Sequence, residues 1–443
     1  MTSKTFSRRA FAGAGAALGA TGLIGLRARA SSRYSAPALI RAQDGKVKVN
    51  YWTSFGADVN GRAQQKLIDD FNASQDDIEV VPTAYESYET IAQALITGLQ
   101  TGDNPDLTLF SEAWWFRFYL AGVLRDLNEL ITDETNADDY VQSLFVEYQR
   151  NGGQYAIPFA RSTPLLYINT DYLDQAGLDV GMYETWDGIA ENGPAVIADS
   201  DAEVAFAFGS AAGYGAWFLQ GAVWNFDGAY SDEDLNILLT EPGAVEAGEF
   251  MRKLVGDKIA AAVADPVQDF KTGVTAATFG STGSLGNITD SVDFNFKTAF
   301  LPTQKSFGCG TGGSGMAIVN TSPEEVQQAA FKFIEYSTST EVTTYWSQTT
   351  GYMPVRVSAR DSDEMQAFFT EHPNSKTAVD QLEKVQQVDT VMVMVPNGAQ
   401  IIGQGWEQIL VNDRPADEAW AETSGILDTD KEPVLEQIQE VEG

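Results

Sequence analysis

Residues 46–112 alternate between strand-like and helix-like patterns, and this alternation constrains the fold more than any other feature of the chain. Three short segments are rich in β-branched and aromatic residues, as strands are: KVKVNYW, IEVVPTAY and PDLTLFSE. The two segments between them, residues 60–74 and 88–103, carry apolar residues at helical spacing. A β-α-β-α-β order requires parallel strands joined by crossover helices, so the sequence predicts an α/β fold.

Three residues with polar groups follow the ends of these predicted strands. Ligands of open parallel sheets bind beyond the carboxyl ends of the strands. In this chain Ser54, Tyr88 and Glu112 lie there, and the core needs none of them. We therefore expect this edge of the sheet to contribute to a ligand site. A purely solvent-facing role stays open for each residue, because loop tyrosines and carboxylates are common in so acidic a chain.

Two helices are predicted near residues 322–350, each with its own start signal. Ser322 and Glu325 have the spacing of a capping box, with a proline at the expected first helical position. Thr338 and Glu341 repeat that spacing and predict the start of the second helix.

The segment TTGYMPV follows the second of these helices. Gly351 is expected to end the helix in the left-handed conformation, and Pro354 prevents its continuation. Tyr352 is therefore predicted on a short, rigid connector, and one interpretation is that its ring is held there for contact with a ligand. The alternative is that the ring folds back against the last helical turn as an ordinary hydrophobic contact.

The first 30 residues have the composition of an export leader. They contain five basic residues and no acid, a twin-arginine pair at Arg8 and Arg9, an Ala/Gly/Leu-rich run, and small residues up to Ala30. The sequence thus predicts a twin-arginine signal peptide over 1–30 and a flexible spacer over 31–46. The mature protein is expected outside the cytoplasm and associated with the cell surface. Cleavage of the leader and its retention as a tether are both left open.

Acidic residues dominate the charge of the chain. There are 62 Asp and Glu against 28 Lys and Arg, a formal net charge of −34. At molar salt the Debye length falls to about 3 Å, so such a surface no longer repels itself. The composition therefore predicts a halophilic protein. It argues against nucleic acid as a partner, since no basic stripe is present, and the 44% hydrophobic content argues against disorder.

The sequence offers little catalytic or metal-binding chemistry. His372 and Cys309 are single residues of their kind, and neither has the context of a nucleophile system. No zinc-ligand spacing occurs. The motif GTGGSG at 310–315 satisfies a dinucleotide pattern, but a predicted strand follows where a helix should begin. We predict no catalytic residue, no metal and no cofactor, and interpret these glycines as a place where another strand or a ligand approaches the backbone closely.

Aromatic rings and small polar residues recur together in the predicted loops, in WTSF, ESYET, GYGAWFLQGAVWNFDG, STGSLGN and GYMPV. Rings that stack on C–H faces, with hydroxyl and amide groups beside them, suit a polyhydroxy ligand. This composition favours capture of a sugar or polyol without turnover. Surface glycosylation is also possible at the three sequons, Asn72, Asn287 and Asn320.

The run GGSGMAIVNTSPEEVQQAAFKFIEYSTSTEVTTYWSQTTGYMPVR resembles a segment of the extracellular solute-binding proteins of carbohydrate ABC transporters. Further matches in order are YESYETIAQALITGLQTGDNPDLTLFSE, IPFARSTPLLYINTDYLDQAGLD, YGAWFLQGAVWNFDG and GSTGSLGNI. The likeness extends over most of the chain from about residue 46. It is strongest to the branch with the glycerol-3-phosphate-binding protein and weaker to maltose-binding protein.

This resemblance implies a two-lobed, periplasmic-binding-protein-like (type II) α/β fold that closes on its ligand by a hinge motion. The implied N-terminal lobe comprises 47–161 and 303–349, and the C-terminal lobe 162–302 and 350–443. Crossovers are expected near Arg161, Pro302 and Gly351. The implied ligand-binding residues are Tyr88, Glu112, Ser162, Ser284, Gly313 and Tyr352, with Trp217 as a further stacking platform.

One departure from the resemblance bears on the ligand. In that branch an arginine before the C-terminal helices helps to hold a phosphate, whereas the corresponding stretch here, DTVMVMVPNGAQ, contains no basic residue. A neutral sugar, oligosaccharide or polyol is therefore preferred. Arg161 or Arg356 can supply a positive charge from another direction, so glycerol 3-phosphate or another anion stays open.

The resemblance also implies partners, namely the membrane subunits of an ABC permease, and we expect the binding protein to be a monomer. Two functions from other classes are kept as alternatives. A secreted carbohydrate-active hydrolase predicts turnover of its sugar, and a cell-surface structural protein predicts no saturable binding at all.

Overall fold

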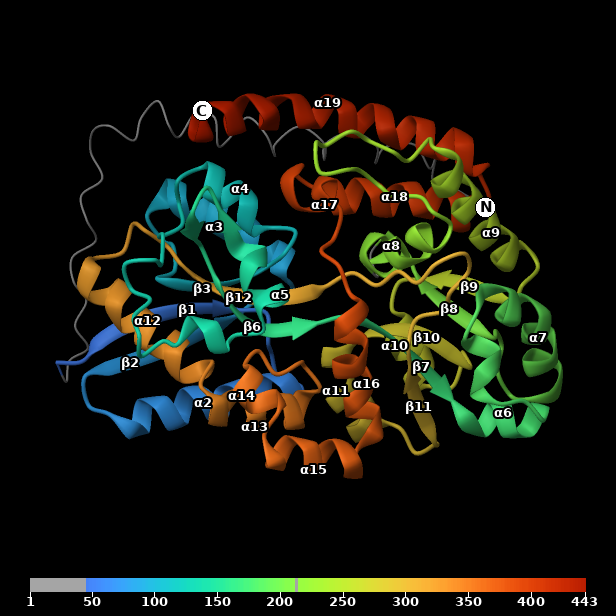
Figure 1. Cartoon of the computed structure of the whole chain (residues 1–443), viewed down its shortest axis with the longest axis horizontal. Helices are drawn as coiled ribbons and strands as arrows, with labels where there is room; N and C mark the ends of the chain where they lie inside the picture. Colours follow the sequence, from blue (N-terminus) through green and yellow to red (C-terminus); the bar gives the residue numbers. More distant parts are fainter. Residues whose placement is uncertain (1–44, 212–213) are drawn as a thin grey trace, which may run out of the picture. The chain divides into compact units, whose positions relative to one another are not determined.

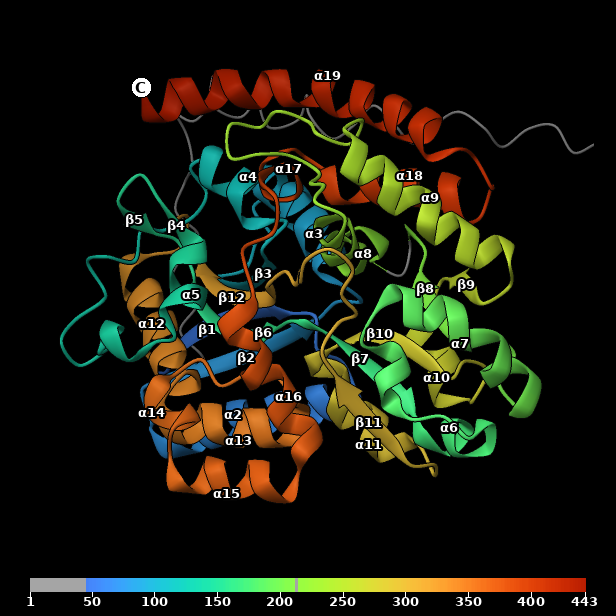
Figure 2. The same ribbon diagram turned by 45° about the vertical axis from the view of Figure 1, so that its right-hand side comes forward.

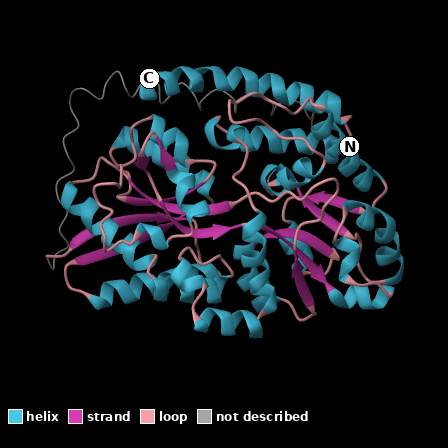
Figure 3. Cartoon of the chain, viewed as in Figure 1, coloured by secondary structure: helices cyan, strands magenta, loops and turns pink. Residues whose placement is uncertain are grey.

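The structure is a computed structural model that describes residues 45–211 and 214–443. The predicted signal peptide and nearly all of the predicted spacer lie outside the described residues. Within the described part, secondary structure alternates between helices and strands along much of the chain (Figure 3). The α/β class predicted from the sequence is confirmed.

One five-stranded sheet among the described residues has the order β2-β1-β3-β12-β6. Its strands are β1 (Val47–Thr53), β2 (Ile78–Ala84), β3 (Leu107–Ser111), β6 (Ile157–Ser162) and β12 (Gly312–Ile318). β1 pairs parallel with both β2 and β3. The helix α2 (Val59–Ser74) connects β1 to β2, and α3 (Tyr88–Thr101) connects β2 to β3. The predicted β-α-β-α-β unit is therefore confirmed. We call this sheet and the helices packed on it the first lobe (Figure 1).

A second five-stranded sheet of the described part has the order β11-β7-β10-β8-β9. Its strands are β7 (Pro164–Asn169), β8 (Phe206–Gly209), β9 (Ala260–Val263), β10 (Ala277–Ser281) and β11 (Phe296–Ala299). The helices of this region are α6 (Thr170–Ala176), α7 (Trp186–Asp199), α8 (Gly215–Asn225), α9 (Pro242–Gly256), α10 (Pro266–Lys271) and α11 (Leu285–Ser291). We call this sheet and its helices the second lobe (Figure 2).

Three chain crossovers meet at Arg161. The chain leaves the first sheet at the end of β6 and enters β7 two residues later. It returns between β11 and β12, where Gly313 pairs with Arg161. The third crossover follows α13 (Thr340–Thr350), and there Met353 N donates to Arg161 O at 2.9 Å. A hinge built from these segments is therefore held together by backbone hydrogen bonds around one buried arginine.

Gly313 allows two of these crossover strands to lie against each other. Its φ is +91°, and a Cβ atom there would lie 2.1 Å from the carbonyl oxygen of Ala160 on β6. Only glycine tolerates both conditions. The predicted close approach of another strand at the GTGGSG motif is thus confirmed.

The two predicted capping boxes are wrong. α12 (Glu324–Ser337) has Pro323 at its N-cap, and the Ser322 hydroxyl instead donates to Asp106 Oδ1 at 2.6 Å. A carboxylate is the stronger acceptor for this hydroxyl, which explains the difference. α13 has Ser339, not Thr338, at its N-cap, because the Thr338 hydroxyl is bonded to Ile334 O within the preceding helix.

The predicted end of α13 is confirmed. Gly351 has φ +90°, and its N–H donates to Ser347 O. The remaining helices are α4 (Trp115–Leu120), α5 (Gln142–Phe145), α14 (Val357–Arg360), α15 (Asp363–Glu371), α16 (Pro373–Gln381), α17 (Thr390–Met394), α18 (Gly398–Leu410) and α19 (Ala416–Glu442), and a small hairpin is formed by β4 (Gln149–Arg150) and β5 (Gly153–Gln154). No helix within 45–211 and 214–443 is long and apolar enough to span a bilayer.

The C-terminal segment packs on both lobes. Trp420 of α19 belongs to the core of the second lobe, whereas Val434 of the same helix packs with Trp115 and Phe118 of the first. Tyr352 likewise packs in a core of the first lobe. The predicted boundaries, 47–161 plus 303–349 and 162–302 plus 350–443, therefore stay a proposal, with parts of 350–443 resting on the first lobe.

Candidate ligand-binding site

The polar groups at the strand ends of the first sheet form a cluster around Tyr88. The Tyr88 hydroxyl donates to Ser314 Oγ at 3.2 Å. It also interacts with the hydroxyls of Ser54 and Tyr352, and the charge of Glu112 acts on it. Tyr88 is the first residue of α3, so the helix start fixes where its side chain leaves the backbone. The strand ends thus bring together residues far apart in the sequence.

Glu112 supplies a buried carboxyl group to this cluster. It follows β3 directly and is only 9% exposed. Its Oε2 atom has no hydrogen-bond partner among the described residues. Burial raises the pKa of Glu112 to about 7, although the nearby Arg161 guanidinium opposes the shift. An unpaired buried oxygen of this kind is ready to accept a hydrogen bond from a ligand hydroxyl.

Arg161 does not offer a free positive charge to this site. Its guanidinium is fully buried, forms an ion pair with Glu147, and donates to the Tyr148 hydroxyl at 2.7 Å. Thr311 donates to the other oxygen of Glu147. Burial lowers the pKa of Arg161, but Glu147, Tyr148 and Glu112 outweigh burial and hold it above its usual value. The guanidinium of Arg161 is therefore occupied by partners within the hinge.

Tyr352 is clamped between both lobes. Its ring stacks on Trp346 of α13, with centroids 5.7 Å apart, and meets Phe55 edge-on at 5.8 Å. A Cβ atom at Gly283 of the second lobe would lie 2.3 Å from Tyr352 Cζ. The alternative that this ring folds back on the last helical turn is confirmed. With only 8% of its surface exposed, Tyr352 offers a ligand little contact area.

Trp217 of α8 is half-buried, and its indole N–H is already used. Nε1 donates to Thr311 O at 2.9 Å, and the ring lies over Gly312, where a Cβ atom would approach Cζ2 to 2.4 Å. Trp217 thereby joins α8 to the strand that carries Gly313. Ser162, at the end of β6, pairs with Gly312 and is 2% exposed.

Ser284 is half-buried and immediately precedes α11. It follows Gly283, which faces the ring of Tyr352. The structure therefore groups the predicted site residues in two sets. Tyr88, Glu112 and Tyr352 interact around one cluster, and Trp217, Ser162 and Gly313 surround the hinge beside Arg161. Their contact with a ligand stays a prediction.

Sequence reasoning missed Tyr214. This tyrosine precedes α8 with φ +57°, a strained conformation for a residue with a side chain, and is 58% exposed. Protein atoms around its hydroxyl, together with Tyr88, Glu89 and Glu112, raise the pKa of that hydroxyl. Its neighbouring glycines in GYG were the available signal, since they free the backbone to take up such a turn.

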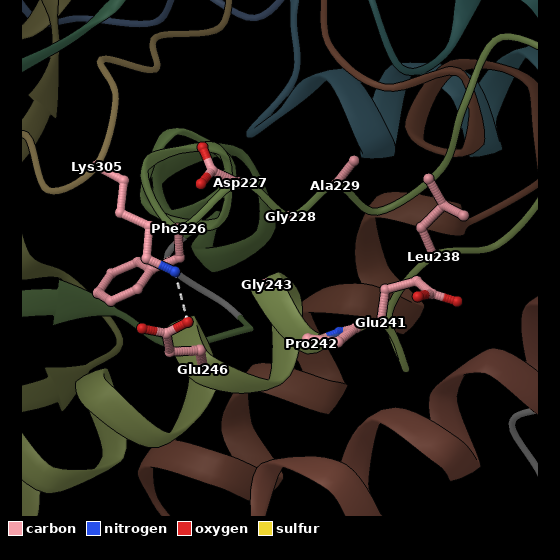
Figure 4. A pocket seen from close by; sticks show the side chains of 10 residues that line it. All are labelled: Phe226, Asp227, Gly228, Ala229, Leu238, Glu241, Pro242, Gly243, Glu246 and Lys305. Atoms are coloured by element: carbon pink, nitrogen blue, oxygen red, sulfur yellow. Dashed lines mark hydrogen bonds and ion pairs between the residues drawn. The ribbon is translucent and has the colours of Figure 1, made fainter.

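A separate cavity of about 450 Å³ lies beside the N-terminal end of α9 (Figure 4). Its walls include Phe226, Asp227, Glu246 and Lys305, and the last two form an ion pair at 2.6 Å. None of the predicted site residues lines it. We regard it as unrelated to the cluster around Tyr88.

Two α/β lobes joined by three crossovers, with a buried carboxyl group and tyrosines where the lobes meet, define the class of two-lobed solute-binding proteins. More particularly, the chain belongs to the bacterial extracellular solute-binding proteins, whose family profile matches residues 66–377. The sn-glycerol-3-phosphate-binding periplasmic protein UgpB of Escherichia coli K12 is 24% identical over 371 residues, or 78% of this chain and 82% of that protein.

Solved structures agree with this assignment. UgpB from Mycobacterium tuberculosis, in complex with glycerophosphocholine, has a TM-score of 0.82 and 34% identity, covering 89% of this chain and 99% of that one. The maltose-bound MalE3 of T. maritima has a TM-score of 0.72 and 19% identity, covering 86% and 99%. The second likeness shows the fold alone. The predicted family and the two-lobed fold are therefore confirmed.

Proposed function

We propose that the protein captures a small, hydroxyl-rich, uncharged solute, a sugar or polyol, and delivers it intact to the permease of an ABC importer. The observation that carries this proposal is the buried Glu112 carboxyl group, whose Oε2 lacks a partner in the described part of the chain. The hydroxyls of Tyr88 and Tyr214 lie close enough to interact with it electrostatically. Such a group binds neutral hydroxyl donors well, because each donor satisfies an otherwise unpaired buried oxygen.

The charges around the cluster oppose an anionic ligand. Glu112 and Glu147 are acidic, and Arg161 is already paired. Arg356, the other arginine considered, donates to Thr338 O and Asn136 O and lies 3.6 Å from Asp139. In the stretch where an arginine would hold a phosphate, Asp389 occurs instead, and it accepts from Tyr230 N at 2.6 Å. A phosphate placed here would meet carboxylates first.

A glycerophosphodiester is the second candidate, favoured by the 34% identity to the mycobacterial protein that was solved with glycerophosphocholine. Glycerophosphocholine combines glycerol hydroxyls, a phosphodiester and a trimethylammonium group. Tyr88 and Tyr214 interact with Glu112, and tyrosine rings beside an acid suit a cation. The cluster offers no unpaired positive charge from Arg161 or Arg356 to bind the phosphate of this ligand.

The remaining parts of the proposal concern location and partners. We propose export by the twin-arginine route, action at the cell surface as a monomer, and adaptation to high salt. The family supports an extracellular binding role with membrane permease subunits as partners. We further propose that the protein has no enzymatic activity, because capture and release of an intact ligand require no nucleophile.

A thermal-shift screen of the mature protein at molar salt tests this function. The probes are maltose, maltotriose, glycerol, glycerophosphocholine and glycerol 3-phosphate. A ligand at one hundred times its dissociation constant stabilises the folded protein by about 2.7 kcal/mol. Stabilisation by the saccharides or glycerol supports the first candidate, and stabilisation by the phosphates alone replaces it with the second. Recovery of altered sugar after hours of incubation would contradict a pure binding role.

A further inference from the structure

The start of helix α2 in the first lobe is completed by a side chain from the second lobe. The amide group of Asn287, on α11, makes two hydrogen bonds there. Its Nδ2 donates to Asp58 Oδ2 at 2.8 Å, and its Oδ1 accepts from the backbone N–H of Val59 at 3.1 Å. These partners are separated by 229 and 228 residues along the chain.

Asp58 is held ready for this contact by its own helix. It is the N-cap of α2, and its Oδ1 accepts from Gly61 N at 2.9 Å. That bond lies within the first lobe and fixes the carboxylate, so that Oδ2 points away from the helix. The Val59 N–H is one of the first-turn donors that an α-helix cannot satisfy by itself. Asn287 therefore provides the Val59 N–H with a hydrogen-bond acceptor only while the two lobes are together.

Neighbouring contacts show that this is an interface between lobes. Asn60 Nδ2 donates to Gly283 O at 3.0 Å, and this pair is buried. Gly283 is also the residue that faces the ring of Tyr352. The helix α2 packs in the first-lobe core through Leu67 and Phe71, whereas α11 packs around Tyr167 of β7. Moving the lobes apart must therefore break the Asn287 bonds and separate Gly283 from Tyr352.

An exposed ion pair beside this contact stabilises the interface between the lobes less than the Asn287 hydrogen bonds do. Arg62 lies 3.5 Å from Asp290, and their side chains are 63% and 68% exposed. Exposed pairs of this kind contribute little, and salt screens them. The two Asn287 bonds are short-range and directional, so they persist at high ionic strength. They are the contact on which closure can depend in concentrated salt.

We propose that Asn287 is a positioning residue for ligand capture: it caps α2 from the opposite lobe and so sets the fraction of closed protein. The inference rests on the proposed function only in that closure is what traps the ligand. A binding-competent state that is less populated lowers the apparent affinity in proportion. Loss of the hydrogen bond from Asn287 to the Asp58 carboxylate corresponds to about a tenfold weaker affinity, without any change at Tyr88 or Glu112.

The test compares Asn287→Asp, the double variant Asn287→Asp with Asp58→Asn, and Asn72→Asp as a matched control. Asn287→Asp places two carboxylates together. In the double variant the side chain at position 58 donates and the one at position 287 accepts, so the hydrogen bond between them is restored in the opposite direction. The cap of α2 is kept, since Asn caps helices as well as Asp. Asn72 is bonded to Val80 N and O, within the first lobe. Its replacement can lower stability but leaves the lobe interface intact.

Hydrogen exchange of the Val59 and Gly61 amides and the radius of gyration are measured without ligand at molar KCl. We expect faster Val59 exchange and a larger radius in Asn287→Asp, recovery of both in the double variant, and no effect of Asn72→Asp on Val59. Gly61 should exchange alike in the wild type and Asn287→Asp. Equal Val59 exchange and equal radii in the wild type and Asn287→Asp overturn the inference, as does failure of the double variant to recover.

The affinities for maltose and glycerophosphocholine are measured on the same proteins. About tenfold weaker binding of the active probe to Asn287→Asp, restored in the double variant, supports the inference, and equal affinities overturn it. If none of the probes of the thermal-shift screen stabilises the wild type, the proposed function fails. The exchange and scattering results still decide the role of Asn287, because they need no ligand.

Discussion

The ring of Tyr352 stacks on the indole of Trp346 with an interplanar angle of 15° and a centroid distance of 5.7 Å. Trp346 is fully buried in α13, so it forms a rigid base. The helix ends at Gly351, whose left-handed conformation turns the chain back and lays Tyr352 on that base. A tyrosine held on its ring face in this way has its hydroxyl fixed in place beside Tyr88.

Removing only the Tyr352 hydroxyl should separate binding from stability. In Tyr352→Phe the ring contacts with Trp346 and Phe55 remain, so we expect a cost in unfolding free energy of about 1 kcal/mol. We expect ligand affinity to fall about tenfold, because the hydroxyl partner of Tyr88 is lost. Tyr352→Ala should cost about 3–5 kcal/mol through the cavity it leaves.

The matched control for this comparison is Tyr183→Phe. The Tyr183 hydroxyl donates to Ala205 O at 2.8 Å and is buried in the second-lobe core. Denaturant unfolding and calorimetric titration are measured on each variant. A loss of affinity in Tyr183→Phe equal to that in Tyr352→Phe would assign the effect to general loosening rather than to the cluster.

Glu112 should make the unliganded protein less stable as the pH rises. Its pKa is about 7 in the folded chain and 4.5 in the unfolded chain, so the folded state holds the extra proton between these values. The contribution of Glu112 to the free energy of unfolding is therefore greatest below pH 4.5. It falls by about 3 kcal/mol as the pH passes through 7. Glu147, whose pKa burial also raises, adds a slope of the same sign.

Denaturation midpoints between pH 5 and 8 check this expectation. The variant Glu112→Gln should show a smaller decline than the wild type, with the contribution of Glu147 remaining. A ligand hydroxyl that donates to Glu112 favours the ionised carboxylate, so binding near pH 7 should release a proton. Titrations in buffers of different ionisation enthalpy measure that proton. Identical apparent enthalpies in all buffers would exclude a hydrogen bond from the ligand to the ionised group.

Gly313 should be irreplaceable in the crossover strand. Alanine at this position must adopt φ +91° and bring its Cβ within 2.1 Å of Ala160 O, so the strands have to separate. We expect a loss of at least about 3 kcal/mol in unfolding free energy. Gly425→Ala is the control, because nothing lies within 4 Å of its Cβ position in α19. That change should stabilise the protein by about 0.5–1 kcal/mol, and a loss there would contradict the helix-propensity argument.

Local patterns predicted the parallel unit of the first sheet, the end of α13 at Gly351 and the strand after the glycine motif. Each of these depends on residues that are neighbours in sequence. The failures involve partners chosen by the tertiary fold. Ser322 binds Asp106, which lies 216 residues away, and so does not cap its helix. Nothing near Arg161 in the sequence indicates that its charge is consumed by Glu147 and Tyr148.

The same distinction applies to the candidate site. Tyr88, Glu112 and Tyr352 were predictable because strand ends and helix ends have sequence signals. Tyr214 was not singled out, because the glycines of GYG permit its left-handed backbone conformation but do not require it. The Asn287 contact with α2 carries no local signal at all, because its two halves come from different lobes.

Two of the three sequons should remain unglycosylated in the folded, exported protein. The Asn72 amide donates to Val80 O and accepts from Val80 N, and the Asn320 amide donates to Gly122 O. A glycan on either nitrogen replaces a donor hydrogen and adds bulk against the partner strand or turn. At Asn287 the amide is engaged only between the lobes, so opening frees it. Intact-mass and peptide mapping of protein from its native host checks this expectation. Full occupancy at Asn72 or Asn320 would contradict it, and occupancy at Asn287 alone would agree with it.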